Sequence, residues 1–323
     1  MKHGVAEFLD VARESLLLAN GSNEAIEIIL RTFRRPNSRI VTGQSSFIIY
    51  KHAATAAHYE VDEVPHAGLH LDLDAMLAAI GENTRFVFIA NPNNPTGALY
   101  PVELLREIVE IARAHQLIVY ADEIYDKVLY DGAHHTSIAS LADDVFFVTF
   151  NGLSKNYRAA GFRAGWAIVS GEKRHARDYI EGLDILASMR LCANVPAQYG
   201  IQTALGGYQS IDDLVAPGGR LGRQRDLAWG LLAELPGVSC VKPQAAMYLF
   251  PRLDPEMYPI ADDQQFILDL LIEEKVLVVQ GTGFNWPHPD HLRIVFLPAA
   301  DDLTEAIGRF ARFLERYRRE HGA

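Results

Sequence analysis

The sequence predicts an α/β fold in which a mainly parallel sheet is flanked by helices and followed by a smaller C-terminal α+β domain. Helical and strand-like segments alternate through the first two thirds of the 323 residues. Three strand-like segments, residues 85–90, 117–121 and 145–150, are almost uninterrupted apolar runs. Strands of this kind are covered on both faces, which is typical of parallel sheets between layers of helices.

The spacing of apolar residues predicts the remaining elements in order. Before the break at Pro217-Gly-Gly219, we expect a short apolar run at 15–18, helices at 23–33, 47–58, 71–80 and 101–115, and strands at 39–42 and 59–64. A long helix, broken near Pro196, is expected between Gly171 and Gly206. After the break we expect strands at 238–241, 247–250, 276–279 and 292–296, and helices ending at 235, 274 and 318. We therefore predict a large domain at 1–205 and a small C-terminal domain at 206–323.

Composition excludes several classes of function. The net charge is −11, with 30 basic and 41 acidic residues, so no basic excess is present to bind nucleic acid. No run approaches the roughly 20 apolar residues of a membrane helix, and residues 1–10 lack the apolar core of a signal peptide. Cys192 and Cys240 have no metal or redox spacing, and His134 and His135 cannot share a strand face. We expect a cytoplasmic protein with reduced thiols and no metal site.

Polar residues follow three consecutive buried strands. Asn94 lies in the loop after 85–90, Asp122 follows 117–121, and Lys155 follows 145–150. Ligands of such sheets bind outside the carboxyl ends of the strands, so these residues are expected to share one rim. This coincidence is more specific than any single motif in the chain.

The residues around Lys155 suit an aldehyde cofactor that carries a phosphate. The lysine amine can form a Schiff base, while the hydroxyl of Ser154 and the guanidinium of Arg163 can bind phosphate. Ser22 and Asn23 open a helix whose N-terminal N–H groups also attract anions. The structural alternatives are a surface lysine, a surface salt bridge of Arg163, and simple helix capping.

Together with Asn91-Pro-Asn-Asn94-Pro-Thr-Gly97 and Ala121-Asp-Glu-Ile-Tyr125, these residues resemble the pyridoxal-phosphate site of class I aminotransferases, fold type I. In such a site Asp122 keeps the pyridine nitrogen protonated, although it could also cap a helix at 123–128. Tyr125, one helical turn on, and Asn94 are expected to bond the phenolic oxygen, unless Tyr125 is a half-buried core residue. Phe47 either stacks on the ring or packs in the core.

Residues 91–317 are similar to bacterial alanine (glutamate–pyruvate) aminotransferases. The similarity rests on segments such as Phe150-Asn-Gly-Leu-Ser-Lys155 and Val279-Gln-Gly-Thr-Gly-Phe-Asn-Trp-Pro287. It implies amino transfer between L-alanine and 2-oxoglutarate with pyridoxal 5'-phosphate as cofactor, small amino and 2-oxo acids as partners, and a homodimer. It further implies that Lys155, Asp122 and Tyr125 are catalytic, that Arg293 binds the substrate carboxylate, and that Asn194 lies near the substrate. The spacing alone favours an exposed strand arginine at Arg293, and only the resemblance reverses this interpretation.

Residues 16–80 resemble histidinol-phosphate aminotransferases instead, on Leu16-Leu-Leu-Ala-Asn-Gly-Ser-Asn-Glu and Ser45-Ser-Phe-Ile-Ile-Tyr50. The chain therefore reads like a recombinant of two aminotransferase subgroups, and histidinol phosphate is an alternative substrate. Family members carry several dozen residues before the point that matches Leu16, including a dimer arm and a tyrosine that reaches the partner subunit's phosphate. This difference predicts a weaker dimer and makes a non-catalytic protein of this fold an alternative, against which the presence of Lys155, Asp122 and Arg293 argues.

Overall fold

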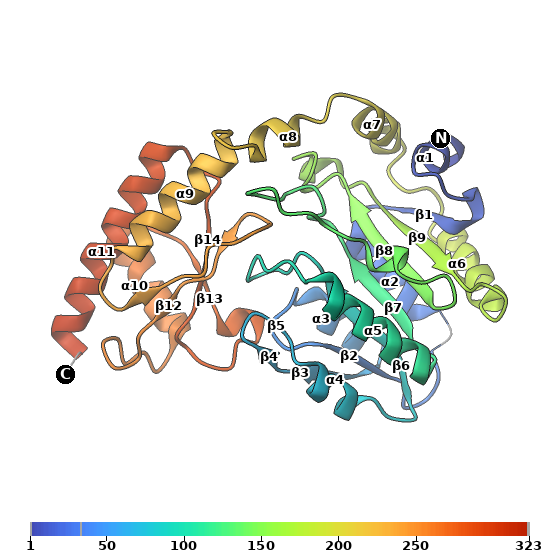
Figure 1. Ribbon diagram of the computed structural model, residues 1–323, viewed down its shortest axis with the longest axis horizontal. Helices are drawn as coiled ribbons and strands as arrows, with labels where there is room; N and C mark the ends of the chain where they lie inside the picture. The colour runs from blue at the N-terminus through green and yellow to red at the C-terminus, as the bar shows by residue number, and fades with distance from the viewer. Residues whose placement is uncertain (1, 33, 322–323) are drawn as a thin grey trace.

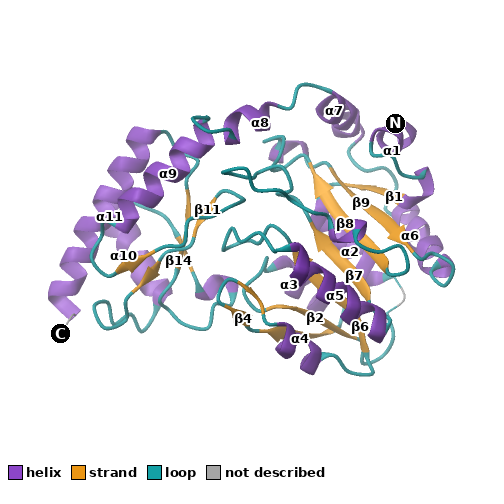
Figure 2. Cartoon of the chain, viewed as in Figure 1, coloured by secondary structure: helices purple, strands orange, loops and turns teal. Residues whose placement is uncertain are grey.

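The computed structural model describes residues 2–32 and 34–321, and a twisted sheet lies at the core of the larger lobe, on the right in Figures 1 and 2. Within the described residues this sheet has seven strands in the order β1-β9-β8-β7-β6-β2-β3. Their bounds are β1 Leu16–Ala19, β9 Gly165–Gly171, β8 Phe146–Gly152, β7 Ile118–Asp122, β6 Thr84–Ala90, β2 Arg39–Gly43 and β3 Glu60–Val64. The five strands from β8 to β3 run parallel, and β9 is antiparallel to both β8 and β1. The predicted mainly parallel sheet is thus confirmed.

Helices cover both faces of this sheet. On one face, alternate residues such as Phe86, Tyr120 and Val148 pack against three helices: α2 (Ser22–Arg31), α3 (Ile49–Ala56) and α6 (Arg177–Met189). On the other, Val87, Val119 and their neighbours pack against α4 (Leu73–Ala79) and α5 (Val102–His115). This two-sided burial explains why the strands are apolar runs rather than alternating patterns. The predicted end of the first helix, Phe33, lies outside the described residues.

The sequence prediction is wrong in the region after Lys155. Strand β9 was not predicted, and the expected helix from Gly171 to Gly206 begins only at Arg177. The predicted break near Pro196 is confirmed, because α6 ends at Met189 and α7 spans Val195–Gly206. Residues 165–171 form the second strand from the edge of the sheet, because each of them pairs with β8 and four of them also pair with β1. These are tertiary contacts that apolar spacing does not report. Asn194 and Pro196 start α7, the former as N-cap.

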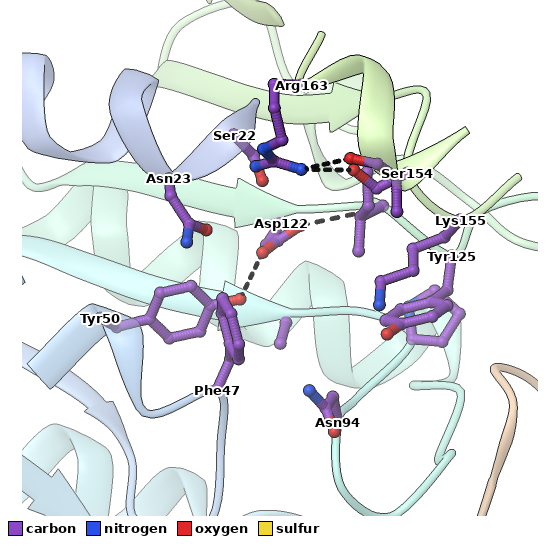
Figure 3. A pocket seen from close by; sticks show the side chains of 14 residues that line it. Ser22, Asn23, Phe47, Tyr50, Asn94, Asp122, Tyr125, Ser154, Lys155 and Arg163 are labelled. Carbon is purple, nitrogen blue, oxygen red and sulfur yellow. Dashed lines mark hydrogen bonds between the residues drawn. The ribbon is translucent and has the colours of Figure 1, made fainter. Parts of the chain in front are cut away.

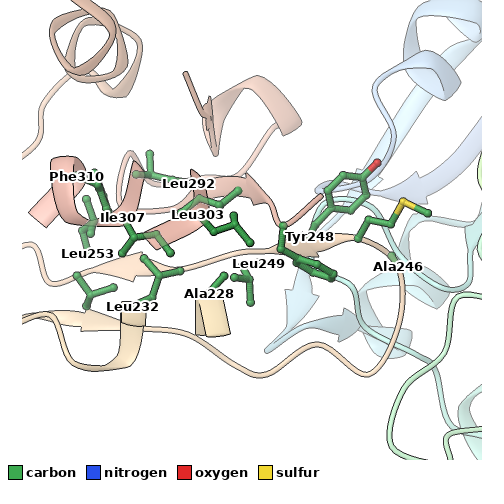
Figure 4. Packing of buried hydrophobic residues seen from close by; sticks show 14 of the residues in the cluster. Ala228, Leu232, Ala246, Tyr248, Leu249, Leu253, Leu292, Leu303, Ile307 and Phe310 are labelled. Atoms are coloured by element: carbon green, nitrogen blue, oxygen red, sulfur yellow. The ribbon is translucent and has the colours of Figure 1, made fainter. Parts of the chain in front are cut away.

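The C-terminal third forms a second lobe with its own core (Figure 4). Its helices are α8 Ser210–Val215, α9 Arg220–Ala233, α10 Asp263–Glu274 and α11 Ala300–His321. Its strands are β10 Val238–Ser239, β11 Tyr248–Leu249, β12 Arg252–Leu253, β13 Val279–Gln280 and β14 Leu292–Val295. Leu232, Leu249, Leu292 and Ile307 are fully or almost fully buried between these helices and strands. The strand expected at 276–279 is shorter and later, at β13.

Short elements complete the described chain. They are α1 Lys2–Phe8, η1 Arg13–Ser15, β4 His66–Ala67, β5 His70–Leu71, η2 Ile138–Ser140, η3 Ala160–Phe162 and η4 Thr282–Phe284. In the described residues, no helix has the length and apolar character of a membrane span.

The core clusters support a proposed division of the chain into two domains at 205/206. Leu205 packs with α1 and the rest of α7, whereas Ile211 packs with α9. Tyr125, Val128 and Tyr130 depart from this division because they join the core of the second lobe.

Candidate active site

Three neighbouring strands bring the sequence-predicted residues to one rim of the sheet. β6, β7 and β8 are adjacent and parallel, and their carboxyl ends lead into the Asn91 loop, Asp122 and the Lys155 loop. Nine of the sequence-predicted residues line a single pocket there (Figure 3): Ser22, Asn23, Phe47, Asn94, Asp122, Tyr125, Ser154, Lys155 and Arg163. The predicted convergence of three strand ends is therefore present in the structure.

One side of the pocket is an anion cradle. Helix α2 begins after Gly21, whose φ of 92° is a backbone conformation that glycine adopts without strain. Among the described residues, no side chain caps the first N–H groups of this helix. The Arg163 guanidinium donates to the Ser154 hydroxyl at 3.4 Å and to the Ala160 carbonyl at 2.8 Å. A Cβ on Gly21 would lie 2.4 Å from Arg163 Nη2, so the missing side chain leaves the space that the guanidinium occupies. Uncapped helix N–H groups, a hydroxyl and a guanidinium together bind phosphate.

Asp122 is buried at the floor of the pocket. Its Oδ2 accepts a hydrogen bond from the Tyr50 hydroxyl at 2.6 Å, and its Oδ1 accepts one from the Ile124 N–H at 3.2 Å. Burial raises the pKa of Asp122, while these two bonds and the Lys155 ammonium act against that rise. A buried carboxylate held in this way can stabilise a cationic ring nitrogen. The expected helix at 123–128 is absent, and this segment forms consecutive turns in the structure.

Lys155 points its amine into the pocket beside Tyr125 (Figure 3). Its Nζ lies 5.7 Å from the centre of the Tyr125 ring and makes no hydrogen bond or ion pair with any residue that the structure describes. The Tyr125 hydroxyl is 2.5 Å from the Tyr248 hydroxyl of the second lobe. An amine without a salt-bridge partner, near a buried carboxylate, is suited to covalent chemistry with an aldehyde.

Arg293 of the second lobe contacts Asn94, one of the residues that line this pocket. Its Nη1 donates to Oδ1 of Asn94 at 2.9 Å. Its guanidinium carbon lies 4.5 Å from the centre of the Tyr248 ring and 4.4 Å from the centre of the Phe284 ring. Its buried Nε has no hydrogen-bond partner among the described residues, so the guanidinium keeps an unpaired donor that suits a planar anion such as a carboxylate. Arg293 is therefore not the exposed strand arginine that its spacing favoured.

Two sequence-predicted residues have less direct placements. Phe47 is half-buried, lines the pocket and meets the Tyr50 ring edge-on at 5.7 Å, so it faces both the pocket and the core. Asn194 does not line the pocket. It caps α7 by accepting from the Ala197 N–H, and its own N–H donates to Asn20. Its position near the substrate stays a prediction.

Sequence reasoning missed Tyr50, Tyr248 and a buried pair behind the rim. Glu123 and His135 lie with Oε2 and Nε2 4.0 Å apart, and His135 Nε2 is 3.1 Å from the Asn91 carbonyl oxygen. Burial raises the pKa of Glu123 to about 8 and lowers that of His135. The position of Tyr50 in α3, three residues after Phe47, was the signal that could have found it. Among the described residues no group of three potential ligands is placed to bind a metal.

Comparison with known proteins gives the family. A model of aminotransferase class I and II matches residues 1–310. The chain belongs to this family. This aminotransferase is 53% identical over 313 residues to "Glutamate-pyruvate aminotransferase AlaA" of Escherichia coli strain K12, across 95% of this chain and 77% of the relative. It is 52% identical over 310 residues to "Alanine aminotransferase" of Mycobacterium tuberculosis strain H37Rv, across 94% and 72%.

Solved structures agree with this family. An aminotransferase from Escherichia coli superposes with a TM-score of 0.95 at 50% identity, covering 98% of this chain and 81% of that chain. Alanine aminotransferase from Pyrococcus furiosus gives a TM-score of 0.90 at 32% identity, covering 98% and 81%. Since the first alignment covers 95% of this chain, similarity to glutamate–pyruvate aminotransferases is not confined to residues 91–317. The resemblance of residues 16–80 to histidinol-phosphate aminotransferases stays a prediction.

The cofactor of this aminotransferase is pyridoxal 5'-phosphate, on which its family depends. The residues present fit it. The cradle at Gly21 and Arg163 suits the phosphate, the free amine of Lys155 suits the aldehyde, and the buried Asp122 suits a ring nitrogen that carries a proton. The fold is accordingly that of the pyridoxal-phosphate enzymes of fold type I.

Proposed function

We propose that this aminotransferase moves an amino group between L-alanine and 2-oxoglutarate, with pyruvate and L-glutamate as the other pair. The observation that carries the proposal is the meeting of the Lys155 amine, Asp122 and Asn94 in one pocket, with Arg293 bonded to Asn94. The names of relatives at 53% and 52% identity support the choice of substrates.

Each wall of the pocket is assigned one part of the cofactor. The N–H groups of Ser22 and Asn23, the Ser154 hydroxyl and the Arg163 guanidinium would hold the phosphate. Asp122 would pair with the ring nitrogen, Tyr125 and Asn94 would bond the phenolic oxygen, and Phe47 would cover one face of the ring. When bound, pyridoxal phosphate supplies an electron sink and a carbonyl that exchanges with amines.

The substrate side of the reaction uses Arg293 and Lys155. The Arg293 edge would bind the α-carboxylate, which alanine, glutamate and their 2-oxo acids all share. Nζ of Lys155, once released from the cofactor, would take the proton from the substrate α-carbon and later return one. Tyr125 would fix the cofactor oxygen near this amine through its hydroxyl, which Tyr248 positions at 2.5 Å.

We also propose a homodimer. Exposed aromatic side chains of Phe162, Tyr199 and Tyr208 surround a hollow of about 510 Å³ beside the Lys155 loop, and a second copy of the chain would cover them. Light scattering should then give twice the 35.9 kDa mass of the chain. A cytoplasmic location stays a prediction, consistent with the free thiols of Cys192 and Cys240.

The test combines a spectrum with a substrate panel. Purified protein is loaded with pyridoxal phosphate, and its visible absorbance is recorded before and after L-alanine, L-glutamate and histidinol phosphate are added. Conversion by alanine, with pyruvate formed, supports the proposal, whereas conversion by histidinol phosphate alone would replace it. Lys155→Ala is expected to lose the visible band and turnover, and a variant that keeps both contradicts the assignment of Lys155. Bound cofactor with no conversion by any donor would favour the non-catalytic alternative.

A further inference from the structure

A polar contact joins the two lobes beside the pocket. The Asn285 side-chain N–H donates to Oε1 of Glu63 at 2.8 Å, although 222 positions separate the two residues. The other oxygen of Glu63 accepts from Lys51 at 2.6 Å. Glu63 belongs to β3 of the main sheet and Lys51 to α3, whereas Asn285 follows η4 in the second lobe. Phe47 and Tyr50, which line the active-site pocket, lie next to this contact as well.

The turn that contains Asn285 is also held by hydrogen bonds within the second lobe. The N–H and hydroxyl of Thr282 both donate to the buried carboxylate of Asp263, at 3.0 and 2.5 Å. The Asn285 backbone is left-handed, with φ of 58°, a conformation that asparagine adopts more readily than most residues. The segment from Thr282 to Trp286, called here the 282–286 turn, is therefore anchored at its start by Asp263 and at its end by Glu63.

Phe284 is at the centre of this turn and connects it to the substrate side of the pocket. It is 6% exposed, and the centre of its ring lies 4.4 Å from the guanidinium carbon of Arg293. A turn that moves away from β3 would carry this ring with it. This side of the guanidinium would then become hydrated, and its rotamer would lose a restraint.

We propose that Glu63 is a positioning residue for the substrate carboxylate. By accepting from Asn285, it holds the 282–286 turn against the larger lobe, so that Phe284 keeps the Arg293 guanidinium in the plane where it meets the carboxylate. This inference rests on the proposed role of Arg293 and adds a residue that does not itself contact substrate. Because amino and 2-oxo substrates share the α-carboxylate, loss of the contact is expected to raise KM for both, with a smaller change in kcat.

An exchange of donor and acceptor tests the contact. Asn285→Asp keeps the shape and the left-handed preference but places a carboxylate against Glu63. We expect KM for alanine and for 2-oxoglutarate to rise about tenfold, as for loss of a hydrogen bond to a charged group, with kcat changed less than about threefold. Glu63→Gln alone has one acceptor oxygen, which can still accept from Asn285 while the bond from Lys51 is lost, and KM should change less than about threefold. In the double variant the new amide at position 63 would donate to the new carboxylate at position 285, and KM should return to within about threefold of the parent value. If Glu63→Gln does not relieve the effect of Asn285→Asp, the proposed contact is wrong.

A second readout does not depend on catalysis. Hydrogen exchange of the peptide covering residues 279–291 should be faster in Glu63→Ala than in the parent protein. Glu60→Ala is the matched control, because Glu60 lies on the same strand and pairs with Arg39 without reaching the second lobe. Unchanged exchange in Glu63→Ala, or equal acceleration by Glu60→Ala, would overturn the proposal. If the parent protein does not transaminate alanine, the proposed function fails, and hydrogen exchange still decides whether Glu63 holds the turn.

Discussion

Arg293 and Asn94 come from different lobes and are joined by a 2.9 Å hydrogen bond from the guanidinium to the amide oxygen. Because the oxygen of the Asn94 amide is occupied, its nitrogen is left to donate toward the pocket. One contact thus orients both a proposed cofactor ligand and a proposed substrate ligand.

We expect Arg293→Lys to lower kcat/KM for alanine and for glutamate by about 10- to 100-fold. Lysine keeps the charge but has no guanidinium to lie against the Tyr248 and Phe284 rings or to present a planar pair of donors, and a lost charge-assisted bond corresponds to about 1.5–3 kcal/mol. Steady-state kinetics with both amino acids measure the effect. Arg252→Lys, at an exposed ion pair with Asp290, is the control. Near-parental kinetics of Arg293→Lys would remove Arg293 from carboxylate binding.

Tyr50→Phe should weaken the binding of pyridoxal phosphate. The hydroxyl of Tyr50 opposes the rise in the pKa of Asp122 that burial causes, so its loss raises that pKa further and disfavours the carboxylate. An unsatisfied buried acceptor costs about 1–3 kcal/mol, which corresponds to a rise in Kd of roughly 5- to 150-fold in an absorbance titration. Tyr59→Phe removes a buried hydroxyl that has no partner among the described residues and should leave Kd unchanged. An equal effect of the two substitutions would mean that Tyr50 acts only through packing.

Gly21→Ala is expected to damage the phosphate cradle. The new methyl group would lie 2.4 Å from Arg163 Nη2, at a backbone φ of 92° that disfavours any side chain. The guanidinium must move, and cofactor Kd should rise about tenfold or more, through loss of a charge-assisted bond of about 1.5–3 kcal/mol. Gly230→Ala, in open space on α9, should leave cofactor binding unaltered and even favour the helix. Unchanged Kd in Gly21→Ala would show that Arg163 does not hold the phosphate.

Glu123 should make stability fall as the pH rises toward about 8. Burial raises its pKa to about 8, against about 4.3 in an unfolded chain. The folded state therefore binds more protons than the unfolded state between these values, so stability falls as the pH rises through this window and levels off above about 8. Glu123→Gln cannot ionise, so between pH 7 and pH 9 its Tm should fall less than that of the parent protein, by about 2 °C. Glu315→Gln, at an exposed glutamate, is the control. Parallel Tm curves for Glu123→Gln and the parent would contradict this account.

The sequence predicted the parts of the molecule that depend on local chemistry. Buried parallel strands are visible as apolar runs, and polar residues directly after three of them predicted the rim on which Asp122, Asn94 and Lys155 meet. Strand β9 could not be found in this way, because pairing with β8 and β1 is what makes it a strand. Tyr50 and Asp122 are 72 positions apart, and their hydrogen bond arises only when α3 packs over β7. The pairing of Arg293 with Phe284 and Tyr248 likewise depends on how the second lobe folds.

The antiparallel strand β9 has a consequence for how such a site can change. Gly152 at the end of β8 pairs with Gly165 at the start of β9, so the segment between them leaves and re-enters the sheet at the same point. Lys155 and Arg163 both belong to that segment, here called the 152–165 loop. The pairing of Gly152 with Gly165 fixes both ends of this loop to the sheet. Arg293 and its flanking rings belong to the other lobe. Substitutions in the second lobe can therefore change the specificity for the substrate acid without altering the 152–165 loop. Transfer of the whole loop to a related sheet should likewise keep Lys155 and Arg163 in the same relative position.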